Sequence, residues 1–215
     1  MTLPPWVPGD EHDWRPAPEP LLLVQAFVNT SDLELGTDLL AESETANGWL
    51  HLSGLLSGGA TAGPDDLRAA RDVREGIRAL IAHNGGRPEP ADEDLGPLHA
   101  LTRSSRPRLV IGRAGLVQIE SGPGDRLADG LVRLMVIVRD AQRDGTWPRL
   151  KACGNAACGW AFYDRSHSRR GAWCDMASCG NLIKNRNLRA RRSGRAGQAP
   201  AAAREARPIR ADQAT

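Results

Sequence analysis

The spacing of hydrophobic residues predicts a mainly helical body over the first two thirds of the chain. The clearest helix covers residues 64–83, where one apolar stripe contains Leu67, Ala70, Val73, Ile77, Leu80 and Ile81. The four arginines of this segment, Arg68, Arg71, Arg74 and Arg78, mostly avoid that stripe. A second amphipathic helix is predicted over 127–138, and Gly145 is expected to end it.

Shorter elements are predicted around these two helices. Residues 21–29 form an apolar run that fits either a strand or a buried helix, because periodicity does not distinguish the two. Thr37 is expected to cap a short helix, and further helices are expected near 45–56 and 95–103. Two β-rich runs over 108–120, with a turn between them, predict a hairpin. The fold class is therefore α+β: a mainly helical N-terminal domain with one β-hairpin, followed by a small C-terminal domain.

Composition divides the 215-residue chain into four segments. Residues 1–20 contain six prolines and predict a flexible leader. Residues 21–148 form the helical domain, and residues 149–192 hold all four cysteines. Residues 193–215, rich in Ala, Arg, Gly and Pro, predict a disordered basic tail.

Neither export nor membrane insertion is expected from the hydrophobic pattern. No run reaches the 18 or more apolar residues that a membrane helix needs. The first twenty residues lack the basic start and apolar run of a secretory signal. We therefore expect a cytoplasmic protein with no membrane partner.

Charge is distributed unevenly along the chain. Residues 1–148 hold 14 arginines against 22 acidic residues, a net charge of −8, whereas residues 149–215 hold 14 basic and 4 acidic residues, a net charge of +10. A basic end predicts an anionic partner, with nucleic acid as the first candidate. The opposite charges also suggest that the acidic body folds back on the basic end in the free protein.

The cysteines form two pairs of equal spacing, Cys153-x4-Cys158 and Cys174-x4-Cys179. A segment of 44 residues is too small to be held by a hydrophobic core alone. Without an export signal the thiols are expected to stay reduced, and two close thiolate pairs are typical of a closed tetrahedral zinc site. Disulfides, redox chemistry and an iron–sulfur cluster are the alternatives. Four cysteines leave no open position on the metal, so a catalytic zinc is not expected.

This segment also resembles a known family. The motifs Trp160-Ala-Phe-Tyr-Asp164, Arg169-Arg170, Trp173-Cys-Asp-Met176 and Cys179-Gly-Asn181 are similar to the CGNR zinc finger. That finger usually follows an ABATE domain, a mainly helical module of bacterial stress-induced transcription regulators. The body resembles the ABATE domain at Phe27-Val-Asn-Thr30, Asp38-Leu-Leu-Ala41 and Trp49-Leu50. The resemblance covers roughly residues 20–192.

The resemblance implies roles for individual residues. The zinc ligands would be Cys153, Cys158, Cys174 and Cys179. Asp164 and Asn181 match motif positions expected to make hydrogen bonds that support the ligands or a turn. One position departs from the family pattern, because Leu182 stands where an arginine follows Cys-Gly-Asn.

Residues 180–192 are predicted to form a basic helix whose start is anchored by the metal. Such a helix suits a nucleic-acid groove, although a solvated charged face is the alternative. We expect Leu182, Ile183 and Ala190 to pack against Trp160 and Phe162. The candidate nucleic-acid contacts are Lys184, Arg186, Arg189, Arg191, Arg192 and Arg195.

These features predict a zinc-dependent, DNA-binding bacterial transcription regulator whose N-terminal domain senses a signal or dimerises. The alternatives are an RNA- or ribosome-associated protein and a zinc-stapled protein-interaction module. No nucleophile–base constellation stands out, so an enzyme is not expected. A homodimer and a small-molecule effector remain open.

Overall fold

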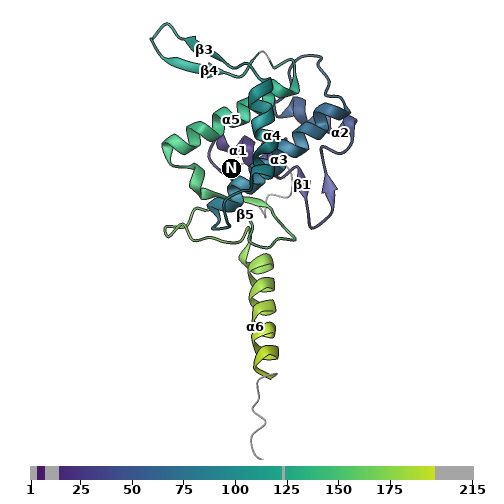
Figure 1. The fold of residues 1–215 in the computed structure, drawn as a ribbon, viewed down its shortest axis with the longest axis vertical. Helices are drawn as coiled ribbons and strands as arrows, with labels where there is room; N and C mark the ends of the chain where they lie inside the picture. The colour runs from purple at the N-terminus through teal and green to yellow at the C-terminus, as the bar shows by residue number, and fades with distance from the viewer. Residues whose placement is uncertain (1–3, 8–14, 123, 197–215) are drawn as a thin grey trace, which may run out of the picture.

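The computed structural model describes residues 4–7, 15–122 and 124–196 (Figure 1). About half of the chain is helical, and the strands form small antiparallel hairpins, which confirms the α+β class. In chain order the elements are α1 Leu21–Val28, β1 Ser31–Asp32, β2 Thr37–Asp38, α2 Ser43–Leu52, α3 Pro64–Asn84, α4 Asp92–Ser104, β3 Arg108–Ile111, β4 Val117–Glu120, α5 Leu127–Asp144, the 3-10 turn η2 Trp147–Arg149, β5 Leu150–Ala152, β6 Ala161–Tyr163, the π-helical turn η3 Met176–Gly180 and α6 Asn181–Ala196.

The apolar run at the start of the body is a helix, α1, and all eight of its residues are buried. It packs against α3, α5 and strand β6, so it lies at the centre of the core. Its Phe27 ring lies beside the Trp49 ring of α2, with a centroid distance of 6.3 Å. Because α1 is surrounded by other elements, it has no polar face, and so the hydrophobic periodicity could not distinguish a helix from a strand.

The two predicted amphipathic helices are confirmed and run longer than their apolar patterns. Helix α3 begins at Pro64, and the Asp66 carboxylate accepts a hydrogen bond from the Gly63 N–H. Helix α5 continues to Asp144 and ends at Gly145, whose φ of 76° is the left-handed conformation of a helix C-terminus. The predicted hairpin is also present as β3 and β4, with Arg108 opposite Glu120 and Ile111 opposite Val117.

The expected helix capped by Thr37 is wrong. Thr37 lies in β2 and pairs with Asp32 of β1. The Asp32 carboxylate accepts hydrogen bonds from the backbone of Glu34 and Leu35, which tightens the turn between the two strands. A ladder of two residue pairs is too short to produce a visible alternation in the sequence.

The described parts of the proline-rich leader, residues 4–7 and 15–20, pack on the body. Ala17 is buried, and the Arg15 carbonyl accepts a hydrogen bond from the Tyr163 N–H. The Trp49 indole donates to the Trp6 carbonyl. At the other end α6 extends to Ala196, four residues into the predicted tail, and residues 197–215 lie outside the described part.

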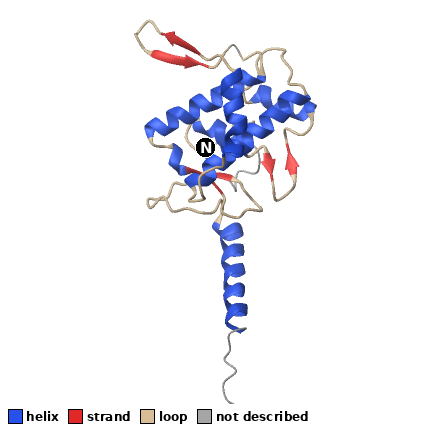
Figure 2. Cartoon of the chain, in the orientation of Figure 1, coloured by secondary structure: helices blue, strands red, loops and turns tan. Residues whose placement is uncertain are grey.

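Hairpin β5–β6 belongs to the same core as the helices. Leu150 and Ala161 are fully buried, and β5 packs against α3. By contrast, β3–β4 projects from one end of the body and α6 from the other, as Figures 1 and 2 show. No helix in the described ranges is long and apolar enough to cross a membrane.

Candidate metal centre and basic helix

The four cysteine thiols converge at the junction between the body and α6. Their sulfur atoms all lie within 4.8 Å of one another. Cys153 follows β5 and Cys158 precedes β6, whereas Cys174 lies in the loop before η3 and Cys179 lies within η3. Three of the thiols are buried and Cys174 is partly buried.

The spacing of the sulfur atoms fits a tetrahedral zinc ion. Four sulfurs at the usual Zn–S distance of about 2.3 Å lie about 3.8 Å apart at the corners of a tetrahedron. The Sγ atoms of Cys158 and Cys174 are 3.7 Å apart, far beyond the ~2.05 Å of a disulfide. All four cysteines are free, so a closed four-thiolate site fits the residues present.

Two turns hold the thiols in place. In the first, the Asn155 carbonyl accepts hydrogen bonds from the N–H groups of Cys158 and Gly159. In the second, the Asp175 carboxylate accepts a 2.6 Å hydrogen bond from the Ser178 N–H, which caps η3. This hydrogen bond lowers the pKa of Asp175 and keeps the carboxylate charged.

The thiols shift one another's pKa because they lie so close together. Hydrogen bonds from Cys158 and then Cys174 lower the pKa of Cys153 to about 2 by stabilising its thiolate. The same interaction raises the pKa of Cys158 to about 12 and also raises that of Cys174. Metal binding must therefore displace protons from the thiols of Cys158 and Cys174.

Asn155 is a site residue that the sequence pattern did not single out. Its side-chain amide lies 3.6 Å from the Cys179 sulfur and joins the first turn to the second. The signal was present, because Cys-Gly-Asn occurs both at 153–155 and at 179–181. Asn181, whose motif position is expected to support the ligands or a turn, donates to the Ala177 carbonyl where η3 passes into α6.

Asp164 organises the loop that leads from β6 toward Cys174. Its buried carboxylate accepts hydrogen bonds from the N–H groups of Ser166 and Gly171 and from the Lys151 ammonium, at 2.9 Å. Burial alone would raise the pKa of Asp164, but the hydrogen bonds from Lys151 and Ser166 outweigh it and hold the pKa below its ordinary value. Lys151 also donates to the Arg169 carbonyl, which fixes the far side of the loop.

Helix α6 begins at the thiol cluster and extends away from the body (Figure 1). Lys184, Arg186 and Arg189 are exposed along it. Arg191, Arg192 and Arg195 also lie in α6, but their side chains are outside the described part. The expected packing of α6 on the finger's aromatic residues is wrong in part, because Leu182 is 56% exposed and Ala190 is exposed.

Two known families match successive parts of the chain. Residues 21–144 match the ABATE family, described as a putative stress-induced transcription regulator, and residues 149–192 match the CGNR zinc finger. The chain belongs to the ABATE family. No curated protein matches it. The match confirms the resemblance seen in the sequence, and the thiol cluster of the CGNR finger is a group able to hold a zinc ion.

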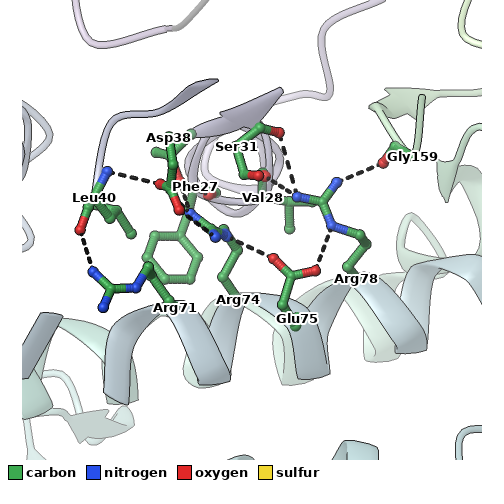
Figure 3. A network of polar contacts seen from close by, with 11 residues as sticks. Phe27, Val28, Ser31, Asp38, Leu40, Arg71, Arg74, Glu75, Arg78 and Gly159 are labelled. Carbon is green, nitrogen blue, oxygen red and sulfur yellow. Dashed lines mark hydrogen bonds and ion pairs between the residues drawn. The ribbon is translucent and has the colours of Figure 1, made fainter. Parts of the chain in front are cut away.

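Buried polar side chains of the ABATE body form hydrogen bonds with the backbone of the finger. Arg78 of α3 donates to the Gly159 carbonyl at 2.7 Å and to the Val28 carbonyl at 2.9 Å (Figure 3). Asn29, which follows the last residue of α1, exchanges two hydrogen bonds with the backbone of Ala161 in β6, at 2.7 and 3.0 Å. The turn after Cys158 and the first residue of β6 are therefore anchored to two helices of the body.

The left-handed backbone at this anchor favours a glycine. Gly159 has a φ of 60°, and a Cβ there would lie 2.8 Å from the Leu33 Cδ1 atom. The same position lets the Arg78 guanidinium reach the backbone carbonyl.

Two arginines of α3 are buried although they lie off the apolar stripe. Arg74 and Arg78 are only 4% and 8% exposed. Glu75 lies between them and accepts a hydrogen bond from each guanidinium, while Arg74 also forms a bidentate pair with Asp38 (Figure 3). The apolar stripe of α3 therefore marks only part of the buried face of the helix. The buried arginines form the rest of that face.

The acidic body does not cover the basic helix in this structure. Helix α6 packs mainly on η3 and points away from the helical body (Figure 1). The hypothesis that the two regions fold together therefore finds no support in the described arrangement.

Proposed function

We propose that the protein is a zinc-dependent, DNA-binding transcription regulator that acts in the cytoplasm. The observation that carries this proposal is the position of α6, a basic helix that starts at the thiol cluster and stands clear of the body. Its 16 residues span about 24 Å at 1.5 Å per residue. A protruding helix of this kind fits the major groove of B-DNA, which is about 12 Å wide.

The zinc ion, when bound by Cys153, Cys158, Cys174 and Cys179, would contribute the cross-link that fixes the start of α6. Cys179 lies two residues before the helix, and Cys153 adjoins a strand buried in the body core. Asn155 and Asp175 hold the two turns around these thiols. The chain thus connects a rigid body to the base of a helix that has little support of its own.

The contacts to nucleic acid would be made chiefly to phosphates. We assign them to Lys184, Arg186, Arg189, Arg191, Arg192 and Arg195 on α6. The loop that follows β6 adds the exposed Arg165, His167, Arg169 and Arg170. The Arg169 backbone has a φ of 54°, uncommon for a non-glycine residue, and the Lys151 hydrogen bond to its carbonyl holds it there.

Duplex DNA is favoured over RNA by the placement of the finger's aromatic side chains. Sequence-specific RNA recognition commonly stacks bases on exposed aromatic rings. Phe162 and Tyr163 are buried, and Trp160 and Trp173 are partly buried against the thiol cluster. We assign the protein no catalytic role, because the matched families are of the regulator and zinc-finger types.

The proposal is tested by titrating the zinc-loaded protein against duplex DNA, structured RNA and single-stranded DNA at one salt concentration. We expect the tightest binding to duplex DNA and at least tenfold weaker binding after zinc is removed. Preference for structured RNA would favour the RNA- or ribosome-associated alternative. Absence of binding to all three would favour a zinc-stapled protein-interaction module.

A further inference from the structure

The β3–β4 hairpin carries a continuous aliphatic face. The register places Leu109 opposite Ile119 and Ile111 opposite Val117, so that these four side chains lie on one face of the ladder. Leu109, Ile111 and Val117 are 72%, 73% and 63% exposed, and Leu116 in the adjoining turn is 64% exposed. Among the described pairs of secondary-structure elements, this hairpin therefore carries the largest cluster of exposed aliphatic side chains.

The hairpin has little support from the rest of the described chain. It is a two-stranded sheet whose main contacts are between its own strands, and it projects from the body (Figures 1 and 2). A lone two-stranded hairpin is at best marginally stable in water. Contiguous apolar patches on monomers are commonly interaction sites.

The aliphatic face of the hairpin fits another aliphatic surface and not a charged one. The charged side chains Arg108 and Glu120 pair across the ladder on its opposite face, 3.9 Å apart, where Gln118 also lies. The aliphatic strand positions bear no charge, so this face offers nothing to a phosphate backbone. Two such faces related by a two-fold axis bury only aliphatic groups against aliphatic groups.

We infer that the protein is a homodimer in which the β3–β4 hairpins of two copies pack face to face. The four most exposed side chains present on the order of 500 Å² per copy, so two copies would bury about 1,000 Å², the lower limit for a specific interface. Packed sheets lie about 10 Å apart, which these side chains can fill. Because the hairpin and α6 lie at opposite ends of the molecule, the dimer leaves both basic helices accessible (Figure 1).

The inference is tested by sedimentation velocity on the full-length, zinc-loaded protein without nucleic acid, from about 1 to 100 µM. We expect the wild type to dimerise in this range. The double variant Ile111→Ser/Val117→Ser should raise the dimer dissociation constant at least about 100-fold, because four aliphatic side chains leave the interface. The matched control Leu35→Ser/Leu52→Ser removes two other exposed leucines, 75% and 62% exposed, and should dimerise like the wild type.

A wild type that stays monomeric at about 100 µM overturns the inference, as does a hairpin variant that dimerises as tightly as the wild type. Leu109→Lys provides a second route, since it sets like charges against each other across the two-fold axis and should also give monomers. Thermal unfolding of each variant shows that it is folded. Because no nucleic acid is present, a failed dimer leaves the DNA-binding proposal untouched.

Discussion

Hairpins β3–β4 and β5–β6 are both two-stranded and antiparallel. They differ in how far their residues are buried and in what packs on them. All six residues of β5 and β6 are buried, held by α1, α3 and the turns around the thiol cluster. In β3 and β4 most residues are exposed, and the main contacts are within the hairpin. A hairpin is stabilised by the residues that pack on it, and of these two hairpins only β5–β6 is covered by other described residues.

Helix α6 resembles β3–β4 in this respect, although the surface it presents is basic instead of aliphatic. The molecule therefore has a rigid centre formed by the body and β5–β6, and two projecting elements of opposite character. Substitutions in the centre should change stability, whereas substitutions in the projecting elements should change association.

Zinc removal should produce the largest effect. Structural zinc sites contribute about 10–16 kcal/mol to folding in zinc-finger peptides. After chelation we expect η3 and α6 to lose structure, while β5–β6 stays ordered because Leu150 and Ala161 belong to the body core. Hydrogen exchange by segment, with and without chelator, measures this. Loss of protection in β5–β6 together with α6 would show that the hairpin depends on the metal and not on the body.

The same substitution in the two hairpins gives the most direct contrast in stability. Leu150→Ala in β5 should cost about 2–5 kcal/mol, because it creates a cavity at a fully buried position. Leu109→Ala in β3, at a position 72% exposed, should change stability by less than about 0.5 kcal/mol. Urea denaturation at a concentration where the protein is monomeric compares the two. Equal costs would contradict the division into centre and projection.

The centre could be predicted from the sequence only where its pattern was simple. The stripe on α3 identified Leu67, Val73 and Ile77 as core. Nothing in one sequence distinguishes Arg74 and Arg78, which are buried against α1, β2 and the turn after Cys158, from arginines in solvent. The cysteine spacing predicted the metal cluster, since ligand chemistry is local. The repeated Cys-Gly-Asn marks Asn155 in the sequence, but only the fold shows that its amide lies beside Cys179.

The ion pair between Asp38 and Arg74 should make the stability of the centre depend on pH. Burial alone would raise the pKa of Asp38, but the hydrogen bonds from Arg74 and from the Leu40 N–H, together with the positive charges of Arg74 and Arg71, outweigh it, so the pKa lies below its ordinary value. A lowered pKa means that the pair stabilises the fold above the unfolded pKa of about 3.9 and that this contribution is lost as pH falls through the folded value.

Asp38→Asn tests this linkage. At pH 7 it should cost about 1–2 kcal/mol, a modest value because the Asp38 side chain is 24% exposed. The difference between variant and wild type should shrink as pH falls below about 4, which denaturant titrations at pH 7, 4 and 3 would measure. A difference that stays constant over this range would mean that the pair contributes nothing through its charge.

Leu182→Arg should have the smallest effect and alters only a projecting element. It restores the arginine that follows Cys-Gly-Asn in the CGNR pattern, at a position 56% exposed in the first turn of α6. We expect unchanged stability, DNA binding tighter by about threefold to tenfold, and a log–log salt slope steeper by about one. Fluorescence anisotropy at several salt concentrations measures it, with Leu188→Arg on the same helix as the comparison for a nonspecific added charge. Equal gains from both would assign no special role to position 182.

The central claim, that α6 is the face that binds DNA, is tested most directly by the salt dependence of duplex binding. If four to six basic residues of α6 neutralise phosphates, the log–log slope of the full-length protein should be about −4 to −5. Arg186→Ala/Arg189→Ala should flatten it by about two, whereas Arg103→Ala/Arg143→Ala, which removes two exposed arginines from the body, should leave it unchanged. A slope near zero, or a slope that the body variant flattens as much as the helix variant does, would contradict the claim.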